Sequence, residues 1–414
     1  MKNIAQHLTR AFAGLALAAL VAAPALVQAQ TPITKEEKDE VLTRMTELIT
    51  RNAFVPGVDF SKWAGYVDKE RTEIDDAKDA ESFNTAVNKA LQQFGFSHIV
   101  LMSPQAARAR VDRSVIGIGV TIVQEEGGFR VVMTIPDAPA TKAGIVPGDL
   151  LLEADGKKLE TTTQITGQEG TDVSIKLRKE DGTEKTVTLT RTKFSTVRPE
   201  TLTWANDDTA VIKIYTFDLS YDRKNVEELM EQAAKAKNLI VDLRSNGGGA
   251  VVNMTHFLSL LMPPGTPIGS FITKRTVERF VEDTQGDPND VVAIAKWSPS
   301  KLRTMKGRIE PFTGKVAILL NEGSGSASEI AAAALKDNLE APIVGHPSAG
   351  AVLASIMVPL PQGFMLQYPI TDYVTLKGLR LEGNGLKPDV EAPTPRYNEK
   401  DVAVEKAVSL LKHG

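Results

Sequence analysis

The chain has 414 residues, with 48 lysines and arginines against 52 aspartates and glutamates, so its formal net charge is -4, and it contains no cysteine. A weakly acidic chain without a basic stripe is poorly suited to neutralising phosphates, so no nucleic-acid partner is expected. Disulfides are excluded, and a chain of this length can be stabilised by its buried cores alone.

The first 29 residues have the pattern of a secretory signal peptide. Lys2 and Arg10 precede an apolar run from Ala11 to Ala23, and small residues end at Ala29, before Gln30. The run is shorter than the ~20 residues of a membrane-spanning helix, and no integral membrane segment is expected after signal removal. Loss of the two positive charges moves the net charge from -4 to -6. We expect a periplasmic or secreted mature protein.

Residues 30–110 are predicted to form a helical N-terminal region, because apolar residues recur there at helical spacing. The two apolar stripes are Val41, Met45, Leu48 and Ile49, and then Phe83, Val87, Leu91 and Phe94. Gly95 is expected to end the second helix. The pair Ser97-His98 follows directly, where the chain leaves the helices.

Residues 111–193 change to short alternating strands with turn signals, which predicts a β-rich module. The segment Ala143-Gly144-Ile145-Val146-Pro147-Gly148-Asp149 resembles a signature of PDZ domains. That resemblance implies that Gly117, Ile118 and Gly119 form a loop whose N–H groups bind the C-terminal carboxylate of a peptide, while the peptide extends the sheet. A Gly-x-Gly alone is more often a simple turn. Residues 161–170 are short and polar for a helix that lines a peptide groove.

Residues 194–414 alternate strand and helix, which predicts a layered α/β domain with strands buried on both faces. The fold class is therefore α/β and multidomain. Glycine, proline and aspartate residues between 264 and 290 indicate a long connection, a candidate cover for the active site.

Ser326 is the candidate nucleophile of this domain. It lies in the glycine- and serine-rich segment 321–329, directly before an alanine-rich helix. Ser326 and Glu329 also have the spacing of a capping box, a structural role that the local sequence favours. Both roles are partly compatible, because a nucleophile at a helix start places the next N–H, that of Ala327, where it can stabilise an oxyanion. A second donor would come from the glycine turn 247–249.

The strand and glycine turn at 239–249, together with the Ser326 segment, resemble the C-terminal processing peptidase family, also called tail-specific proteases. The resemblance implies a crotonase- or ClpP-like α/β domain, with Gly248 as the second oxyanion donor and Gly247 as the alternate. In most of that family a lysine base follows the serine by 25 residues, but here Ala351 occupies that position. The chain is then a dead enzyme, a lysine-to-alanine variant, or a branch with a different base.

The third possibility is favoured, because two further motifs resemble the tricorn-protease branch of the same superfamily. These are Ser97-His98 and the segment around Glu382. The resemblance implies that His98 is the base, that Ser97 is a relay or orienting hydroxyl, and that Glu382 supports them. A histidine has a suitable pKa for this task. His346 is a competitor near the altered turn, and His256 is expected to pack within a helix.

The sequence therefore predicts an exported serine endopeptidase acting on polypeptides, with recognition of their C-termini as one possibility. No metal or organic cofactor is implied. One alternative is an inactive binding protein on the peptidase fold, since retinoid-binding members of the superfamily hold ligands. The others are a PDZ adaptor and a serine–lysine peptidase disabled by Ala351. Asp242 and Arg244 are expected to form an ion pair that shapes the glycine turn.

Overall fold

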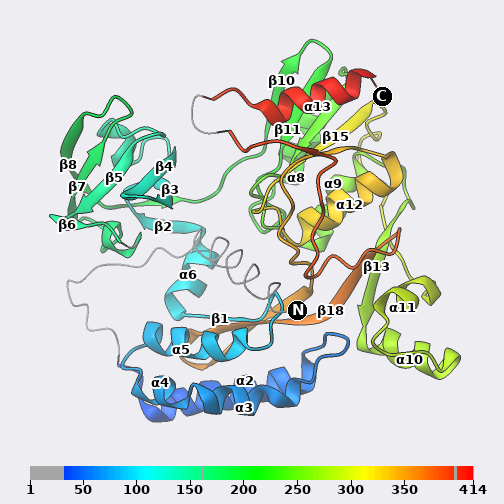
Figure 1. Cartoon of the computed structure of the whole chain (residues 1–414), viewed down its shortest axis with the longest axis horizontal. Coiled ribbons are helices and arrows are strands. Elements are labelled where there is room, and N and C mark those ends of the chain that lie inside the picture. Colours follow the sequence, from blue (N-terminus) through cyan, green and yellow to red (C-terminus); the bar gives the residue numbers. More distant parts are fainter. Residues whose placement is uncertain (1–31, 161, 396–398, 414) are drawn as a thin grey trace.

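The computed structural model describes residues 32–160, 162–395 and 399–413, so the predicted signal segment 1–29 lies outside the described residues. The described chain contains a helical N-terminal part, a β-rich module and a larger α/β part (Figure 1). The predicted mixed α/β, multidomain fold class is confirmed. Within the described ranges, no helix has the length and apolar character needed to cross a membrane.

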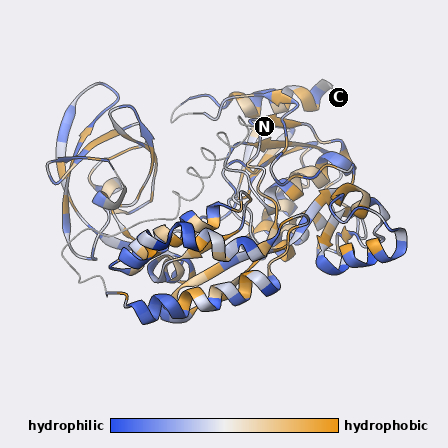
Figure 2. Ribbon diagram, turned by 60° about the horizontal axis from the view of Figure 1, so that its bottom comes forward, coloured by the Kyte–Doolittle hydropathy of each residue, from blue (hydrophilic) through white to orange (hydrophobic). Residues whose placement is uncertain are grey.

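The N-terminal part consists of amphipathic helices, which show one hydrophobic and one hydrophilic side in Figure 2. These are α2 (Lys35–Asn52), α3 (Trp63–Lys69), α4 (Arg71–Asp76) and α5 (Ala80–Gln92). The two predicted apolar stripes lie in α2 and α5, except that Phe94 follows the end of α5. All of their residues are buried except Phe94, which packs against the same core partly exposed. This core also contains Leu353, Phe364 and Leu366 from the far end of the sequence. The helices are therefore anchored on strands of the α/β part.

The β-rich module is an antiparallel sheet in the order β3-β4-β5-β7-β8, with β6 paired to β5. Its strands are β3 (Val120–Glu125), β4 (Gly128–Thr134), β5 (Leu150–Ala154), β6 (Lys157–Lys158), β7 (Asp172–Arg178) and β8 (Glu184–Thr190). The helix α6 (Pro104–Asp112) and the ribbon of β2 (Ser114–Gly117) and β9 (Thr192–Ser195) connect it to the rest of the chain. Strand β3 is an edge strand of the module.

The short helix α7 (Pro139–Lys142) and the 3₁₀ helix η2 (Thr162–Ile165) complete the module. The polar segment 161–170 thus contributes a single short turn where a groove-lining helix was considered. This agrees with its composition, because the segment has too few apolar residues to support a longer helix.

The central sheet of the α/β part has the order β10-β11-β12-β15-β16-β19 and is parallel except for β10. Its strands are β10 (Thr201–Asn206), β11 (Thr209–Lys213), β12 (Asn238–Asp242), β15 (Lys315–Leu320), β16 (Ile343–Gly345) and β19 (Val390–Glu391). Helices α8 (Arg223–Ala233), α9 (Val251–Ser259) and α12 (Ala327–Leu339) share one core with the sheet, and α13 (Val402–His413) covers the other face. Burial on both faces explains the continuous apolar runs of these strands.

A second sheet has the order β1-β18-β13-β14, with β17 also paired to β18. It is formed by β1 (Val100–Met102), β13 (Pro267–Thr273), β14 (Leu302–Arg303), β17 (Ala354–Pro359) and β18 (Met365–Thr375). The suggestion that residues 264–290 form a long cover for the site is wrong. They contain β13 and the helix α10 (Lys274–Thr284), which packs with α11 (Val291–Trp297) on β13 and β18 at one end of the molecule (Figure 1).

Candidate active site

Three turns meet at one edge of the central sheet because they follow adjacent parallel strands. Strand β12 leads into the glycine turn 247–249, β15 leads into the segment that ends at Ser326, and β16 leads into the turn that contains Ala351. The carboxyl ends of neighbouring parallel strands lie side by side, which is where open α/β sheets bind ligands. The sheet order thus brings together motifs separated by about a hundred residues.

Ser326 lies on a strained turn at the start of α12. Its φ and ψ are 54° and -120°, a combination that non-glycine residues rarely adopt. The Glu329 carboxylate accepts a hydrogen bond from the Ser326 N–H at 3.1 Å, so the half of the capping box in which the glutamate bonds back is confirmed. The Glu329 N–H donates to the Ser326 backbone carbonyl at 2.9 Å. The hydroxyl is left to face the cleft.

The two neighbouring serines of the motif have structural roles. Ser324 and Ser328 are fully buried, and their hydroxyls donate to the carbonyls of Leu243 and Asn246 at 2.9 and 2.8 Å. Both bonds fasten the start of α12 to the strand and turn of β12. Ser326 is therefore the serine of the three whose hydroxyl is available for chemistry.

The structure connects Ser326 to the three residues that the sequence predicted as its partners. The Ser326 Oγ lies 3.2 Å from His98 Nε2, and His98 Nδ1 lies 2.6 Å from Ser97 Oγ. Ser97 Oγ donates to Glu382 Oε2 at 2.8 Å, while the Ser97 N–H donates to Glu382 Oε1 at 2.8 Å. The Val352 N–H also donates to Glu382 Oε2, at 2.7 Å. Four side chains thus form one continuous path.

Strand pairing in the second sheet explains this contact across the sequence. Ser97 and His98 come directly before β1, and Glu382 follows β18, the strand that pairs with β1. His98 adopts a φ of 60°, a left-handed backbone conformation that non-glycine residues rarely adopt. Ser97 and Glu382 are both buried, at 1% and 7% exposure, so their hydrogen bonds are shielded from water.

Burial lowers the pKa of the His98 imidazole from its ordinary 6.5 to about 4. The physical cause is loss of hydration, which disfavours the charged ring. Burial also raises the pKa of Glu382, against hydrogen bonds from Ser97 and Val352 that lower it. His98 is therefore neutral at pH 7 and able to accept a proton.

The other described histidines that were considered lie elsewhere. His346 Nδ1 is 3.6 Å from Glu322 at the surface and does not line the cleft that contains Ser326. His256 lies in α9, where it contacts the Tyr221 hydroxyl at 3.0 Å and Glu227 at 3.1 Å. The predicted packing role of His256 agrees with these contacts.

The glycine turn lies directly against Ser326. Gly248 has a φ of 98°, and a Cβ at this position would lie 2.6 Å from the Ser326 Cβ and 2.9 Å from the Ala327 nitrogen. The Gly248 N–H donates to Asn246 Oδ1 at 2.9 Å, so this predicted oxyanion donor is already bonded. In the described part of the chain, the N–H groups of Gly247 and Ala327 have no hydrogen-bond acceptor. The alternate, Gly247, thus has an N–H free to bind an oxyanion, whereas that of Gly248 is bonded.

Substituting Gly248 by alanine is expected to lower turnover by about 10²- to 10³-fold, because displacing this turn moves the neighbouring unbonded Gly247 N–H away from the oxyanion, and that is the range for loss of one such donor. The added methyl group would collide with Ser326 and strain a backbone suited to glycine. Steady-state peptide hydrolysis measures the effect, and Gly127→Ala is the control, because Gly127 also has a positive φ but no neighbour within 4 Å of an added Cβ. Equal losses in the two variants would contradict the assigned role of the turn.

Glu329 has a larger role than its capping position indicated. Its two oxygens also accept hydrogen bonds from the Ser348 hydroxyl at 2.5 Å and from the N–H groups of Gly350 and Ala351 at 2.8 and 3.0 Å. Burial raises its pKa to about 7, although these bonds oppose the shift. The Ala351 carbonyl accepts from the Ser326 N–H at 2.8 Å. Glu329 therefore fixes the Ser326 turn and the altered lysine turn together, a role that local sequence could not reveal.

The predicted Asp242–Arg244 ion pair is confirmed. Arg244 Nη2 lies 2.7 Å from Asp242 Oδ2 and 2.7 Å from Asp401 Oδ2, and Lys213 Nζ lies 2.9 Å from Asp242 Oδ1. Asn246 supports the same turn, since its side chain donates to the Ile214 carbonyl at 3.0 Å. An asparagine at the start of a glycine turn was the one sequence signal for this support.

A cleft of about 2640 Å³ connects these elements to the β-rich module. It is lined by residues of all three parts, including His98, Ser326, Ala351 and Thr121. This volume exceeds that of ordinary small-molecule pockets, and suits a polymeric ligand. The predicted loop 117–119 runs from the last residue of β2 to the start of β3, and in the described chain the N–H groups of Ile118 and Gly119 have no hydrogen-bond acceptor.

Comparison with known proteins agrees with this architecture. Residues 208–392 match the family model described as Peptidase family S41. A probable CtpA-like serine protease of Staphylococcus haemolyticus (strain JCSC1435) is 25% identical over 298 residues, covering 69% of this chain and 54% of the relative. The chain thus spans about half the length of the curated relatives it matches.

Two solved structures have a similar fold. The photosystem II D1 C-terminal processing protease has a TM-score of 0.52 and 21% identity, covering 87% of this chain and 94% of that one. The tricorn protease has a TM-score of 0.51 and 16% identity, covering 91% of this chain and 37% of that one. The resemblance to C-terminal processing peptidases is confirmed, and residues 208–392 match an S41 peptidase domain.

Proposed function

We propose that this protein is an exported serine endopeptidase in which Ser326 is the nucleophile and His98 is the base. The observation that carries the proposal is the unbroken path from the Ser326 hydroxyl through His98 and Ser97 to Glu382, with neighbouring distances of 3.2, 2.6 and 2.8 Å. A serine hydroxyl needs an adjacent base to become a nucleophile, and the base needs a group that orients it.

The hydrogen-bond path also favours one tautomer of His98. An ionised Glu382 can only accept, so the Ser97 O–H donates to it and the Ser97 oxygen accepts from His98 Nδ1–H. His98 Nε2 then has a free lone pair directed at the Ser326 hydroxyl. Three donors point at the Glu382 carboxylate, which supports its ionised form despite burial.

Peptide hydrolysis would proceed through an acyl-enzyme. Ser326 Oγ attacks the scissile carbonyl carbon while its proton passes to His98 Nε2, and the N–H groups of Ala327 and the glycine turn stabilise the oxyanion. When the C–N bond breaks, His98 gives the proton to the leaving amine. Water then attacks the ester with His98 again as base, which releases the acid and restores Ser326.

The β-rich module is proposed to hold the substrate in an extended form. Strand β3 is at the edge of its sheet, so a peptide strand can add to it by main-chain hydrogen bonds. The unbonded N–H groups of Ile118 and Gly119 at the start of β3 support carboxylate binding there. A PDZ adaptor without turnover would use the same surface, so activity must be tested directly.

The test is incubation of the purified protein with an unfolded protein, beside a Ser326→Ala control, together with labelling by a fluorophosphonate probe. We expect degradation and labelling of the parent protein and neither in the control. Degradation at the same rate by both proteins would show that Ser326 is not the nucleophile. No degradation by either would favour a binding protein.

A lysine at position 351 separates the proposed mechanism from a disabled serine–lysine dyad. Because His98 already contacts Ser326, Ala351→Lys is expected to change kcat/KM by less than about tenfold. A tenfold change corresponds to ~1.4 kcal/mol in the activation free energy. The measurement is peptide hydrolysis by Ala351→Lys with and without His98→Ala. A gain of several orders of magnitude that is insensitive to His98→Ala would show that the lysine is the missing base.

A further inference from the structure

Among the described residues, two arginines of the cleft have no carboxylate partner within 4 Å. Its cationic lining residues within the described chain are Arg110, Arg113, Lys193, Arg198, Lys213 and Arg244. Four of these six lie within 4 Å of an aspartate: Arg110, Lys193, Lys213 and Arg244. Arg113 is exposed and donates to the Leu219 carbonyl at 3.2 Å. Arg198, the other arginine without a carboxylate partner among the described residues, is partly buried.

Arg198 is held in place by neutral groups. One guanidinium nitrogen donates to Thr121 Oγ1 at 3.2 Å, and its Cζ lies 5.9 Å from the centre of the Tyr215 ring. Lys213 Nζ lies 5.6 Å from the same ring centre, so positive charge surrounds this tyrosine. Desolvation lowers the pKa of Arg198, although a guanidinium stays charged at neutral pH. A partly desolvated charge without a counter-ion is costly, and an anionic ligand would remove that cost.

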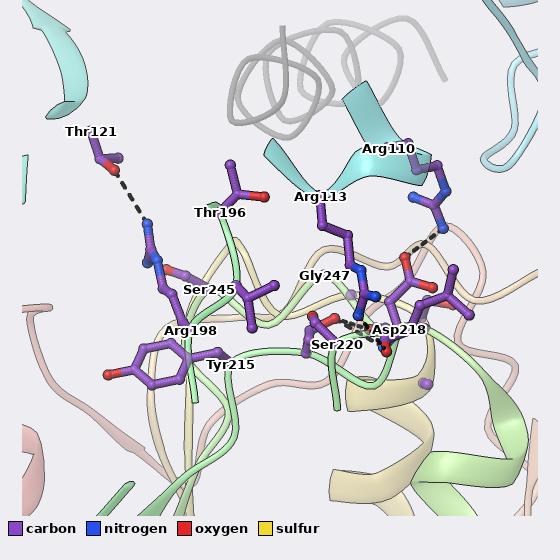
Figure 3. Close-up of a pocket in the computed structure, with 18 of the residues that line it drawn as sticks. Arg110, Arg113, Thr121, Thr196, Arg198, Tyr215, Asp218, Ser220, Ser245 and Gly247 are labelled. Atoms are coloured by element: carbon purple, nitrogen blue, oxygen red, sulfur yellow. Dashed lines mark hydrogen bonds and ion pairs between the residues drawn. The ribbon is translucent and has the colours of Figure 1, made fainter. Parts of the chain in front are cut away.

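The position of Arg198 links the peptide-binding edge to the candidate nucleophile. Thr121 belongs to the edge strand β3, and Figure 3 shows Arg198 between Thr121 and Tyr215. Tyr215 is followed by Thr216 and Phe217, which donate to the Gly248 carbonyl at 3.2 and 2.8 Å. Gly248 in turn lies against Ser326. A peptide on β3 would therefore pass Arg198 on its way to the site.

We propose that Arg198 forms a carboxylate subsite in the cleft, which recognises a carboxylate of the polypeptide substrate beside the edge of β3. This inference rests on the proposed peptidase function. A guanidinium has five N–H donors, so the bond to Thr121 leaves others for a bidentate contact with a carboxylate. The Tyr215 ring limits the orientations of the guanidinium plane. The carboxylate is supplied by the substrate C-terminus or by an aspartate or glutamate side chain.

Binding to the Ser326→Ala protein tests the subsite without turnover. Four fluorescent peptides share one core and combine a free or amidated C-terminus with an internal glutamate or glutamine. We expect the preferred carboxylate peptide to bind about 10- to 100-fold more tightly than its neutral counterpart, as for hydrogen bonds to charged groups. The pair that shows the preference identifies whether the source is the terminus or the side chain.

Adding Arg198→Met should abolish this preference without changing the affinity for the doubly neutral peptide, and Arg198→Lys should retain part of it. The matched control is Lys193→Met, which removes one charge from the same cleft but from a residue paired with Asp112. It should keep most of the preference. Equal loss in the Lys193 and Arg198 variants would show that the carboxylate is attracted by the overall positive charge of the cleft rather than by a local subsite. That result would overturn the proposal.

The proposal also fails if all four peptides bind equally to the Ser326→Ala protein, or if none binds. Cleavage of the same peptides by the protein with Ser326 intact separates this result from the proposed function. Binding that depends on Arg198 without any cleavage would refute the peptidase but keep the subsite. Cleavage at equal kcat/KM for all four peptides would refute the subsite but keep the peptidase.

Discussion

Replacing His98 by alanine is expected to lower kcat of peptide hydrolysis by about 10⁴- to 10⁶-fold, because the Ser326 hydroxyl then loses the base within hydrogen-bond distance. The remaining turnover would come from substrate binding and the oxyanion donors. Steady-state hydrolysis of a fluorogenic peptide measures the loss. The matched control is His346→Ala, since His346 is a second histidine of the described chain that does not line the cleft and lies beside Glu322. If the His346 variant loses activity and the His98 variant does not, the assigned base is wrong.

The same assignment predicts an unusual pH dependence. His98 acts as a base only when neutral, and burial lowers its pKa to about 4. We therefore expect kcat/KM to hold as pH falls through 6.5 and to drop only near pH 4, below the range of an ordinary histidine. An acid limb centred near 6.5 would contradict this, and NMR titration of the His98 ring in the Ser326→Ala protein assigns the limb to the residue.

The free energy of unfolding should also depend on pH, because His98 has different pKa values in the folded and unfolded chains. The folded His98 has the lower pKa, so between about pH 6.5 and 4 the unfolded chain binds more protons at this residue. Its contribution to stability is complete above 6.5 and is lost as pH falls through that window. Replacing His98 with a residue that does not titrate should remove this part of the pH dependence in denaturant unfolding measurements.

Glu382→Gln is expected to lower turnover by about 10- to 10⁴-fold while leaving the fold intact. The carboxylate accepts three hydrogen bonds on two oxygens, two from Ser97 and one from Val352. A glutamine places an NH₂ group against at least one of these donors, which disturbs Ser97 and the tautomer of His98. The unsatisfied donor should also reduce the free energy of unfolding by about 1–3 kcal/mol.

The double variant His98→Ala/Glu382→Gln separates this role from a purely structural one. If Glu382 acts through His98, the double variant should be about as slow as His98→Ala alone, because residues that act as a unit are not additive. Glu322→Gln is the exposed control and should change neither activity nor stability. Fully additive losses in kcat would indicate that Glu382 acts independently of His98.

The sequence alone determined the layers of this protein and the two motifs at its centre. Apolar runs predicted the strands buried on both faces, and helical spacing predicted the packed faces of α2 and α5. The serine segment and the glycine turn were recognisable because each lies in one short stretch. Their meeting point also follows from local order, since both come after neighbouring parallel strands.

The polar partners His98, Ser97 and Glu382 were suggested by a family resemblance, and only the tertiary structure shows that they meet at that centre. His98 and Ser326 are separated by 228 positions in the sequence, and Ser97 and Glu382 by 285. Sequence separations this long give no information on whether two side chains meet. The four-way bonding of Glu329, the bonded N–H of Gly248 and the unpaired charge of Arg198 also depend on neighbours from distant segments. Burial is a property of the packed fold, so the lowered pKa of His98 had no signal in the sequence.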